Sequence, residues 1–347
     1  MQHSSGIPNQ DATAIRARDW VSVLANYRDP SSARSWFEIA VTAGPFLGLW
    51  AVAWWMIHIH PALAVLVSVL NAGFLLRLFA IQHDCGHGSF FKNRTTSDWV
   101  GRVIGVLTLT SYDVWRHSHS IHHSAAGNLA RRGIGDINTL TVAEYQGRSL
   151  FKRLTYRLYR NPVVLFGIGP SYTFFLENRL PFGFMNKAKF WVSSMSTNAA
   201  ILVALLTIYY FGGAMPLLTI FIPTTLVAAT IGVWLFYVQH QFEQTHWEEG
   251  EDWDLHEAAL HGSSHYVMPK VLQWFSANIG IHHVHHLYSR IPFYRLPEVL
   301  RDHTALAEGN RMTIVESFAN ARLHLWDEKS KRLLSFAQAR QNTSAQQ

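Results

Sequence analysis

The chain of 347 residues has only one cysteine, Cys85, and only 15% of its residues are charged. A single cysteine excludes an internal disulfide and any cysteine-rich zinc or iron–sulfur site, so imidazole and carboxylate groups are the remaining metal ligands. The sequence also contains no HPGG haem-binding signature and no glycine fingerprint for a flavin or a nicotinamide. Any metal site in this chain is therefore expected to be built from histidine and acidic side chains.

The basic residues give a net charge of +6 but form no continuous stripe along the chain. They are scattered around hydrophobic segments, which argues against nucleic acid as a partner and favours anionic lipid headgroups. Hydrophobic residues make up 49% and aromatic residues 13% of the chain. This composition is typical of a membrane protein and not of two soluble domains.

Four apolar stretches are long enough to cross a bilayer, which takes about 20 residues in a helix. They are residues 36–57, 61–82, 190–212 and 217–239. Two short turns connect them into two hairpins, and these turns contain no Lys or Arg, whereas both tails and the long middle loop are rich in them. The positive-inside rule therefore predicts an integral, multi-pass membrane protein whose two termini and middle loop face the cytoplasm.

Several shorter segments have their own predictions. Two further apolar stretches, 100–112 and 162–176, are too short to span, and we expect them to lie at the membrane surface or to re-enter it. Arg77 lies inside the second span near its cytoplasmic end, and we expect its side chain to snorkel to the headgroups, with a role near the acyl entrance as the alternative. Residues 1–20 are polar and predicted to be a flexible tail. The chain from about residue 290 to 347, which includes HLWDEKSKRLL at 324–334, is predicted to be a peripheral helix followed by a loose polar tail.

Histidines gather in three short clusters: HDCGH at 83–87, HSHSIHH at 117–123 and GIHHVHHL at 280–287. Partners within a cluster stand three or four residues apart, which places them on one helix face within an arc of about 100°. A lone histidine is usually a solvated or hydrogen-bonded side chain, but chance rarely supplies three such clusters in one chain. Imidazole suits zinc, copper and iron alike. The candidate metal ligands are His83, His87, His119, His122, His123, His282, His285 and His286.

The three clusters, with flanking residues such as Trp115, Gly280 and Pro292, resemble the three histidine boxes of the membrane fatty acid desaturases. The resemblance is to the acyl-lipid omega-6 (delta-12) branch in particular and runs from about residue 75 to about residue 300. It implies two non-haem iron ions that activate O2, and a fatty acyl substrate carried on a lipid, on coenzyme A or on a carrier protein. It also implies a separate electron donor such as ferredoxin or cytochrome b5, and no catalytic side chain beyond the metal ligands.

The resemblance further implies an additional histidine ligand near the end of the last span. Two irons with four or five ligands each need more than the eight imidazoles of the boxes. Our candidate is His240 in VQHQFEQTHW, and His246 in the same segment is the alternative.

Four residues close to the boxes are predicted to give indirect support. Asp84 and Asp136 are expected to accept hydrogen bonds from ligand imidazoles and so fix their orientation. His117 points away from the ligand arc of its helix and His283 lies at the edge of its arc, so neither is predicted to bind metal. The LHEAALH segment at 255–261 is not a zinc-protease motif, because its two histidines are five residues apart instead of four.

Together these features predict an all-α membrane protein with four transmembrane helices in two hairpins and a cytoplasmic helical cap that carries the histidine boxes. We divide the chain into an N-terminal cytoplasmic tail (1–35), a membrane desaturase domain (36–335) and a polar C-terminal tail (336–347), with cytoplasmic metal-binding regions at 83–189 and 240–335. The predicted function is O2-dependent introduction of a double bond into a fatty acyl chain. The alternative is a membrane di-iron hydroxylase or oxygenase of an alkane, sterol or carotenoid, and a more remote one is a non-enzymatic metal-binding membrane protein.

Overall fold

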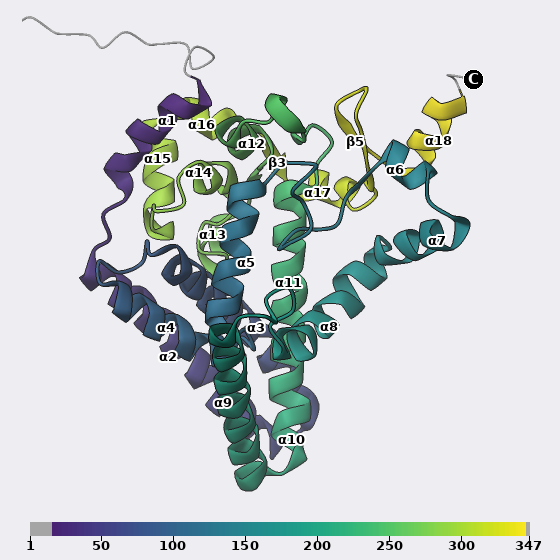
Figure 1. The fold of residues 1–347 in the computed structure, drawn as a ribbon. Helices are drawn as coiled ribbons and strands as arrows, with labels where there is room; N and C mark the ends of the chain where they lie inside the picture. The colour runs from purple at the N-terminus through teal and green to yellow at the C-terminus, as the bar shows by residue number, and fades with distance from the viewer. Residues whose placement is uncertain (1–15, 345–347) are drawn as a thin grey trace, which may run out of the picture.

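The computed structural model describes residues 16–344, and residues 1–15 and 345–347 lie outside the described part of the chain. Long helices form a tapered lower half of the molecule, and shorter helices and loops form a broader cap above them (Figure 1). The predicted helical membrane architecture is confirmed, with a few short strands added within the cap.

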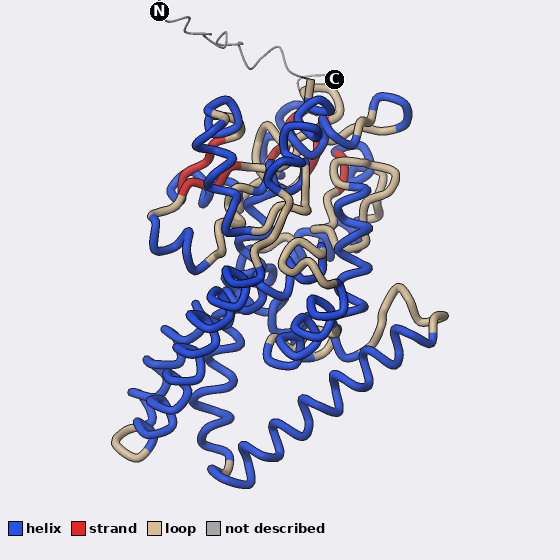
Figure 2. Tube along the Cα trace, turned by 90° about the vertical axis from the view of Figure 1, so that its left-hand side faces the viewer, coloured by secondary structure: helices blue, strands red, loops and turns tan. Residues whose placement is uncertain are grey.

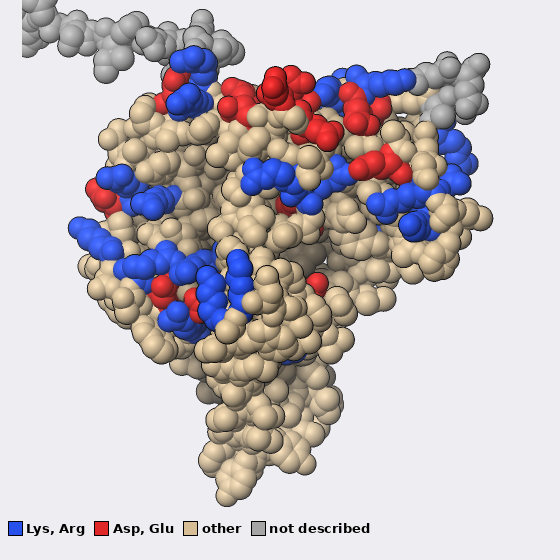
Figure 3. Space-filling view, viewed as in Figure 1, with Lys and Arg blue, Asp and Glu red and all other residues tan. Residues whose placement is uncertain are grey.

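Four helical segments in the range 16–344 are long and apolar enough to cross a membrane, and each overlaps one predicted span. They are α2 (Ser32–Ile57), α3 (Pro61–His87), α9 (Ala188–Gly212) and the segment Ala214–His240, made of α10 (Ala214–Pro216), η5 (Leu217–Phe221) and α11 (Ile222–His240). Helix α3 packs against both α2 and α11. Both hairpin turns lie at the end opposite the cap (Figure 2), and the tapered end shows no charged side chain on its visible face (Figure 3).

The segment between the two hairpins is helical along much of its length. Its helices are α4 (Arg94–Leu107), α5 (Tyr112–Ala125), α6 (Val142–Gln146), α7 (Leu150–Tyr159), the π-helical turn η3 (Val164–Ile168) and α8 (Gly169–Phe175). The two short apolar stretches correspond to α4 and to η3 with α8, and each has exposed apolar side chains, including Trp99, Val103, Ile168 and Leu176. Neither stretch forms a helix of spanning length.

The chain after the last span builds the rest of the cap. Its helices are α12 (Leu255–His261), α13 (Lys270–Phe275), α14 (His282–Leu287), α15 (Leu296–Asp302), α16 (Thr304–Glu308), α17 (Ile314–Asn320) and α18 (Phe336–Ser344). Short strands lie among them within the cap (Figure 2). The parallel pair β2 (His265–Val267) and β3 (Arg311–Thr313) forms one sheet, and β1 (Leu140–Thr141), β4 (Leu325–Asp327) and β5 (Arg332–Leu334) form the other in the order β1-β4-β5.

One buried apolar cluster joins the cap to the end of the second span. It contains Trp20 and Leu24 of α1 (Ala17–Leu24), Ile81 and Cys85 of α3, and Val284 of α14. Cys85 is a free, buried thiol and fills space inside the first histidine box. Burial of these side chains holds the end of α3 against α14, so boxes one and three are brought together by ordinary core packing.

The prediction that Arg77 snorkels to the headgroups is wrong. Its side chain is only 2% exposed and forms an ion pair with Glu38 of α2, whose side chain is also 2% exposed. The Arg77 guanidinium further donates to the Trp274 carbonyl of α13 and lies 4.0 Å from the centroid of the Trp274 ring. A carboxylate on the neighbouring span neutralises the charge inside the protein, so the side chain has no need to reach water.

Two predictions about the ends of the chain also need correction. Segment 324–334 is not a helix but the β4–β5 hairpin: β4 pairs with both β1 and β5, and Trp326 of β4 and Leu333 of β5 are buried. The flexible tail predicted for residues 1–20 lies partly outside the described residues, but from Ala17 onward the chain is α1, with Trp20 in the core. In the segment taken as a polar C-terminal tail, α18 covers Phe336–Ser344.

Candidate metal centre

The nine predicted ligands come from four helices whose ends meet at the base of the cap. Box one lies in the last turn of α3, which ends at Gly88 with a left-handed φ of 71° that glycine adopts without strain. Box two lies on α5 and box three on α14, while the additional candidate, His240, is the last residue of α11. The cap ends of the two hairpins, at box one and at His240, therefore lie close together.

The first histidine group takes five side chains, and their ligand nitrogens lie within 4.8 Å of one another: His83, His87, His119, His123 and His285. The Nε2 atom of His87 lies 3.3 Å from that of His83 and 3.0 Å from that of His119. The Nε2 atom of His123 lies 3.1 Å from that of His119 and 3.2 Å from that of His285. The imidazoles therefore point their Nε2 atoms at a common centre.

The second histidine group takes the other four side chains: His122, His240, His282 and His286. The Nε2 atom of His240 lies 3.2 Å from that of His122 and 2.9 Å from that of His282. Both ring nitrogens of His286 are buried without a hydrogen-bond partner among the described residues. A buried polar atom without a partner is rare in proteins, and a metal ion is one group that would satisfy it.

The spacing of these nitrogens fits ligands around first-row metal ions. A metal–nitrogen bond of about 2.1 Å places ligands that are 90–110° apart at roughly 3.0–3.4 Å from each other. The Nε2–Nε2 separations of 2.9 to 3.3 Å lie close to this range. The residues present therefore fit two metal ions, one in each group, and the nitrogen donors suit iron among other metals.

The HxxHH spacing divides each box between the two groups. On α5, His119 and His123 stand four residues apart and face the first group, whereas His122 faces the second. On α14 the division is reversed, because His282 and His286 face the second group and His285 the first. Each of these helices therefore contributes to both groups, and the two groups are held in fixed relation to each other.

Oxygen atoms behind the rings orient three of the imidazoles. Asp84 lies 3.2 Å from Nδ1 of His83 and also accepts the Phe293 backbone N–H at 2.7 Å. Asp136 lies 2.5 Å from Nδ1 of His122, and the Gly262 carbonyl lies 3.3 Å from Nδ1 of His240. An oxygen at Nδ1 favours the tautomer with hydrogen on that nitrogen, which leaves the Nε2 lone pair directed at the centre.

Burial favours the neutral form of the five cap histidines whose pKa is lowered. In the cap helices it holds the histidine pKa values well below their ordinary range, and the neighbouring imidazoles add to this effect because two adjacent positive charges would repel. The residues whose pKa is lowered in this way are His119, His123, His282, His285 and His286. A neutral imidazole has a free lone pair, the form that binds a metal ion.

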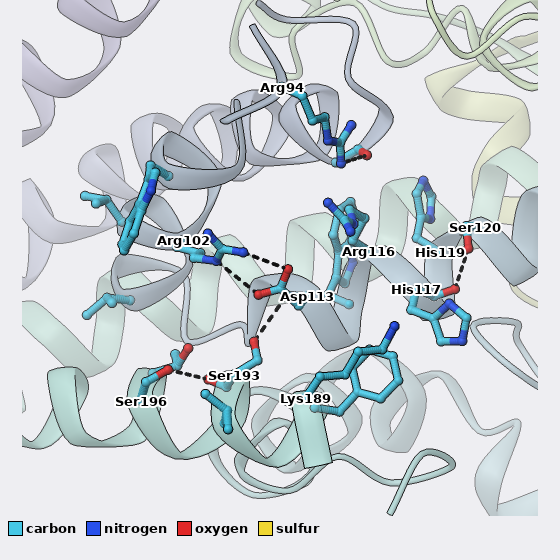
Figure 4. Close-up of a pocket in the computed structure, with 18 of the residues that line it drawn as sticks. Arg94, Arg102, Asp113, Arg116, His117, His119, Ser120, Lys189, Ser193 and Ser196 are labelled. Atoms are coloured by element: carbon cyan, nitrogen blue, oxygen red, sulfur yellow. Dashed lines mark hydrogen bonds and ion pairs between the residues drawn. The ribbon is translucent and has the colours of Figure 1, made fainter. Parts of the chain in front are cut away.

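The three histidines near the boxes that were not our first choice as ligands, His117, His246 and His283, belong to neither group. His117 and His119 project in different directions from α5 (Figure 4), and the His117 ring stacks on Phe190 at 5.1 Å. The Nε2 atom of His283 lies 2.7 Å from the Leu306 carbonyl. The supporting roles of His117 and His283 and the choice between His240 and His246 therefore stay predictions.

The packing of Trp115 beside box one was not predicted from the sequence. The Trp115 ring stacks on the His119 ring with centroids 4.7 Å apart. A Cβ atom on Gly86 would lie 2.8 Å from the same indole, so only glycine fits there without a shift. Trp115 and Gly86 both lie in or beside the boxes, but their contact depends on how α5 crosses the end of α3.

Comparisons with known proteins give one consistent result. The family model described as fatty acid desaturase matches residues 59–318. A "Fatty acid desaturase" of Bacillus subtilis is 40% identical over 328 residues, which cover 94% of this chain and 93% of that protein. Two Synechocystis proteins are more distant. An "sn-1 acyl-lipid omega-3 desaturase (ferredoxin)" is 27% identical, and the match covers 79% of this chain and 76% of that protein. An "sn-1 oleoyl-lipid 12-desaturase" is 24% identical, and the match covers 83% of this chain and 81% of that protein.

Proposed function

Because the chain belongs to the fatty acid desaturase family, a class of oxidoreductases, we propose that it desaturates an acyl chain carried on a membrane lipid and that its nine clustered histidines hold two iron ions. The observation that carries the proposal is the division of nine imidazoles into groups of five and four with converging nitrogens. One ion cannot be bound by all nine, because five or six ligands fill the coordination shell of a first-row metal.

Zinc fits the nitrogen donors but not the reaction, because zinc has no redox chemistry. When bound, the two irons would supply that chemistry: O2 takes two hydrogens from adjacent carbons of the acyl chain, together with two electrons and two protons from outside, and is reduced to two waters. The remaining tasks are positional and belong to the protein.

Named residues perform these tasks. Asp84 and Asp136 hold the rings of His83 and His122 in the orientation that directs Nε2 to the centre. Burial of box three excludes water from one side of the site, since all six side chains of α14 are buried. Exclusion of water strengthens the electrostatic interactions within the site and prevents side reactions.

The charge pattern supports a cytoplasmic position for the cap and for both termini. The turns at the far end of the hairpins have no Lys or Arg, whereas the segments that join the cap ends of the spans have many. The positive-inside rule places the basic side in the cytoplasm. Cytoplasmic carriers could then deliver electrons, and we propose a ferredoxin-like donor, since one relative bears ferredoxin in its name.

Elemental analysis and product analysis of two neighbouring variants test the proposal. The full chain is expressed in a host with a simple lipid profile, and new double bonds are located by mass spectrometry of derivatised fatty acids. His282→Ala should lower iron content and reduce product by roughly 100-fold or more, because it removes one ligand from the second group. His283→Ala is the matched control and should keep wild-type iron content, because its ring faces the Leu306 carbonyl.

Three results would contradict the proposal. One zinc and no iron in anaerobically purified protein would refute the di-iron centre. A hydroxylated lipid in place of an alkene would favour the oxygenase alternative. Equal loss of iron in both variants would show that the ligand assignment on α14 is wrong.

A further inference from the structure

A groove of about 980 Å³ opens between α4, α5 and α9, and its inner end reaches the candidate metal centre. His87 and His119 of the first histidine group line that inner end, beside Trp115. Arg94, Arg102, Arg116 and Lys189 stand around the groove, with Asp113 between them (Figure 4). The groove is therefore a half-open space with basic groups at its rim and metal-site histidines at its end.

One of the four basic groups is fully compensated. The guanidinium of Arg102 makes two hydrogen bonds to the carboxylate of Asp113, at 3.1 and 3.2 Å. The Asp113 backbone N–H in turn donates to the Ser193 hydroxyl of α9 at 3.3 Å. This pair joins α4, α5 and α9 and closes one wall of the groove.

The other three basic groups carry more positive charge than their partners compensate. Arg94 and Arg116 share a single carboxylate, that of Asp98, at 3.0 and 2.9 Å. The Lys189 ammonium has no acidic partner within ion-pair distance among residues 16–344, and it lies 4.7 Å from the centroid of the Phe190 ring. Figure 3 shows this basic cluster over α4, α5 and the cap end of α9, directly above the uncharged taper. The groove thus has a net positive charge where anionic headgroups would lie.

The walls of the groove on the membrane side are apolar and uncovered. Trp99 and Val103 of α4 are 61% and 63% exposed, and Val192 of α9 is 68% exposed. All three line the groove. Large apolar side chains are left exposed in this way where a lipid or a partner covers them, and tryptophan favours the membrane–water interface.

We propose that this groove binds the phosphate group of a glycerophospholipid, with Arg94, Arg116 and Lys189 on the phosphate and the apolar walls along the start of the acyl chain. The inference rests on the proposed function and specifies the carrier of its substrate. Arg94 also donates to the Gly86 carbonyl inside box one at 3.1 Å, so the anion site is attached directly to the helix end that carries His83 and His87. A lipid held there would have its chain directed toward the first histidine group.

The shape of the groove favours a lipid over an acidic electron-donor protein. A protein surface docks on broad and fairly flat areas, whereas a concave, largely apolar space with a few polar groups is typical of a small-molecule or lipid site. The basic groups stand at the rim of that space and border its apolar walls, above the uncharged tapered end. We therefore propose a lipid as the occupant, and the experiment below includes a result that would instead indicate a protein partner.

The test compares Lys189→Glu with Lys187→Glu in the full-length protein. Both changes reverse one lysine at the start of α9, but Lys187 does not line the groove. The protein is incubated with equal amounts of phosphatidylglycerol and diacylglycerol that carry the same acyl chains, and bound lipid is measured by native mass spectrometry. Wild type and Lys187→Glu should retain phosphatidylglycerol over diacylglycerol by at least about 10-fold, since one charge-assisted hydrogen bond is already worth that much. Lys189→Glu should lower this preference by about 10-fold or more, and Lys189→Arg should restore it.

In turnover, Lys189→Glu should raise the KM for the phosphatidylglycerol-borne chain by about 10-fold and leave kcat within about twofold, because binding and not chemistry is affected. Equal retention of both lipids by wild type would overturn the proposal. So would displacement of the lipid by inorganic phosphate alone, which indicates a small-anion site, or a raised KM for the electron-donor protein with lipid binding unchanged. Lipid retention needs no turnover, so a retained preference without any desaturated product would reject the proposed reaction and keep the groove.

Discussion

Removal of one partner from the buried ion pair between Glu38 and Arg77 is expected to destabilise the protein, and by different amounts for the two partners. The pair joins α2 to α3, and both side chains are only 2% exposed. The Arg77 guanidinium also donates to the Thr42 hydroxyl at 3.2 Å and to the Trp274 carbonyl. It therefore links both helices of the first hairpin to α13, shortly before box three.

The loss in the free energy of unfolding depends on which of the two charges is left without a partner. Glu38→Met leaves the buried Arg77 guanidinium without a carboxylate and should cost roughly 3–5 kcal/mol in the free energy of unfolding. Arg77→Met should cost less, because the Glu38 carboxylate keeps Arg34 at 2.7 Å, and Arg34 is 53% exposed and adapts to water. The double variant removes both charges and should recover most of the loss, since a buried ion pair replaced by apolar groups of similar size is often neutral.

Thermal unfolding of the purified full-length protein, followed by tryptophan fluorescence, measures these differences. Glu38→Met should lower the midpoint by on the order of 10 °C, at about 2–4 °C for each kcal/mol. Arg311→Met is the control, because it breaks an exposed pair with Glu308 and should change stability by less than about 1 kcal/mol. A double variant no more stable than Glu38→Met would refute the charge argument, and the loss would then reflect packing alone.

Four further predictions concern the site and the topology. His240→Ala should lose iron as a box variant does, whereas His246→Ala should retain it, measured by elemental analysis; the reverse would make His246 the ligand. Asp136→Asn should lower iron affinity by about 10–100-fold while leaving the thermal midpoint of the metal-free protein unchanged, because the ring of His122 loses its orienting carboxylate. Ser149→Cys should react only with a thiol reagent applied from the cytoplasmic side, and the native Cys85 is buried and should stay silent; labelling from the outer face would invert the topology. Removal of metal with a chelator should lower the unfolding midpoint, because a ligand that binds only the folded state stabilises it, and an unchanged midpoint would argue against resident metal.

The parts of this molecule that follow from local pattern could be predicted from sequence. Hydropathy and length identify the four long helices, and helical spacing identifies the box histidines, because both depend on residues close together in the chain. The side chains that were misjudged depend on distant partners. Arg77 finds Glu38 on another helix, and segment 324–334 becomes a hairpin because residues near 140 supply a neighbouring strand. Likewise, Trp20 is buried because α1 packs on α12 and α14, which a polar N-terminal sequence does not reveal.

The two histidine groups depend partly on residue spacing within each helix and partly on how the helices pack against one another. In HxxHH, the first and last histidines are four residues apart and separated by about 40° around a helix, whereas the histidine three residues after the first lies about 60° to the other side. This arithmetic alone separates His119 and His123 from His122, and His282 and His286 from His285. It does not say which pair shares an ion with which single residue. That choice is made by the packing of α14 against the ends of α3 and α11, which places the α5 pair with His83 and His87, and the α14 pair with His240. Because every box helix except α3 divides its ligands in this way, a shift of α14 relative to α5 would disturb both groups at once, and the metal centre is expected to form or fail as a unit.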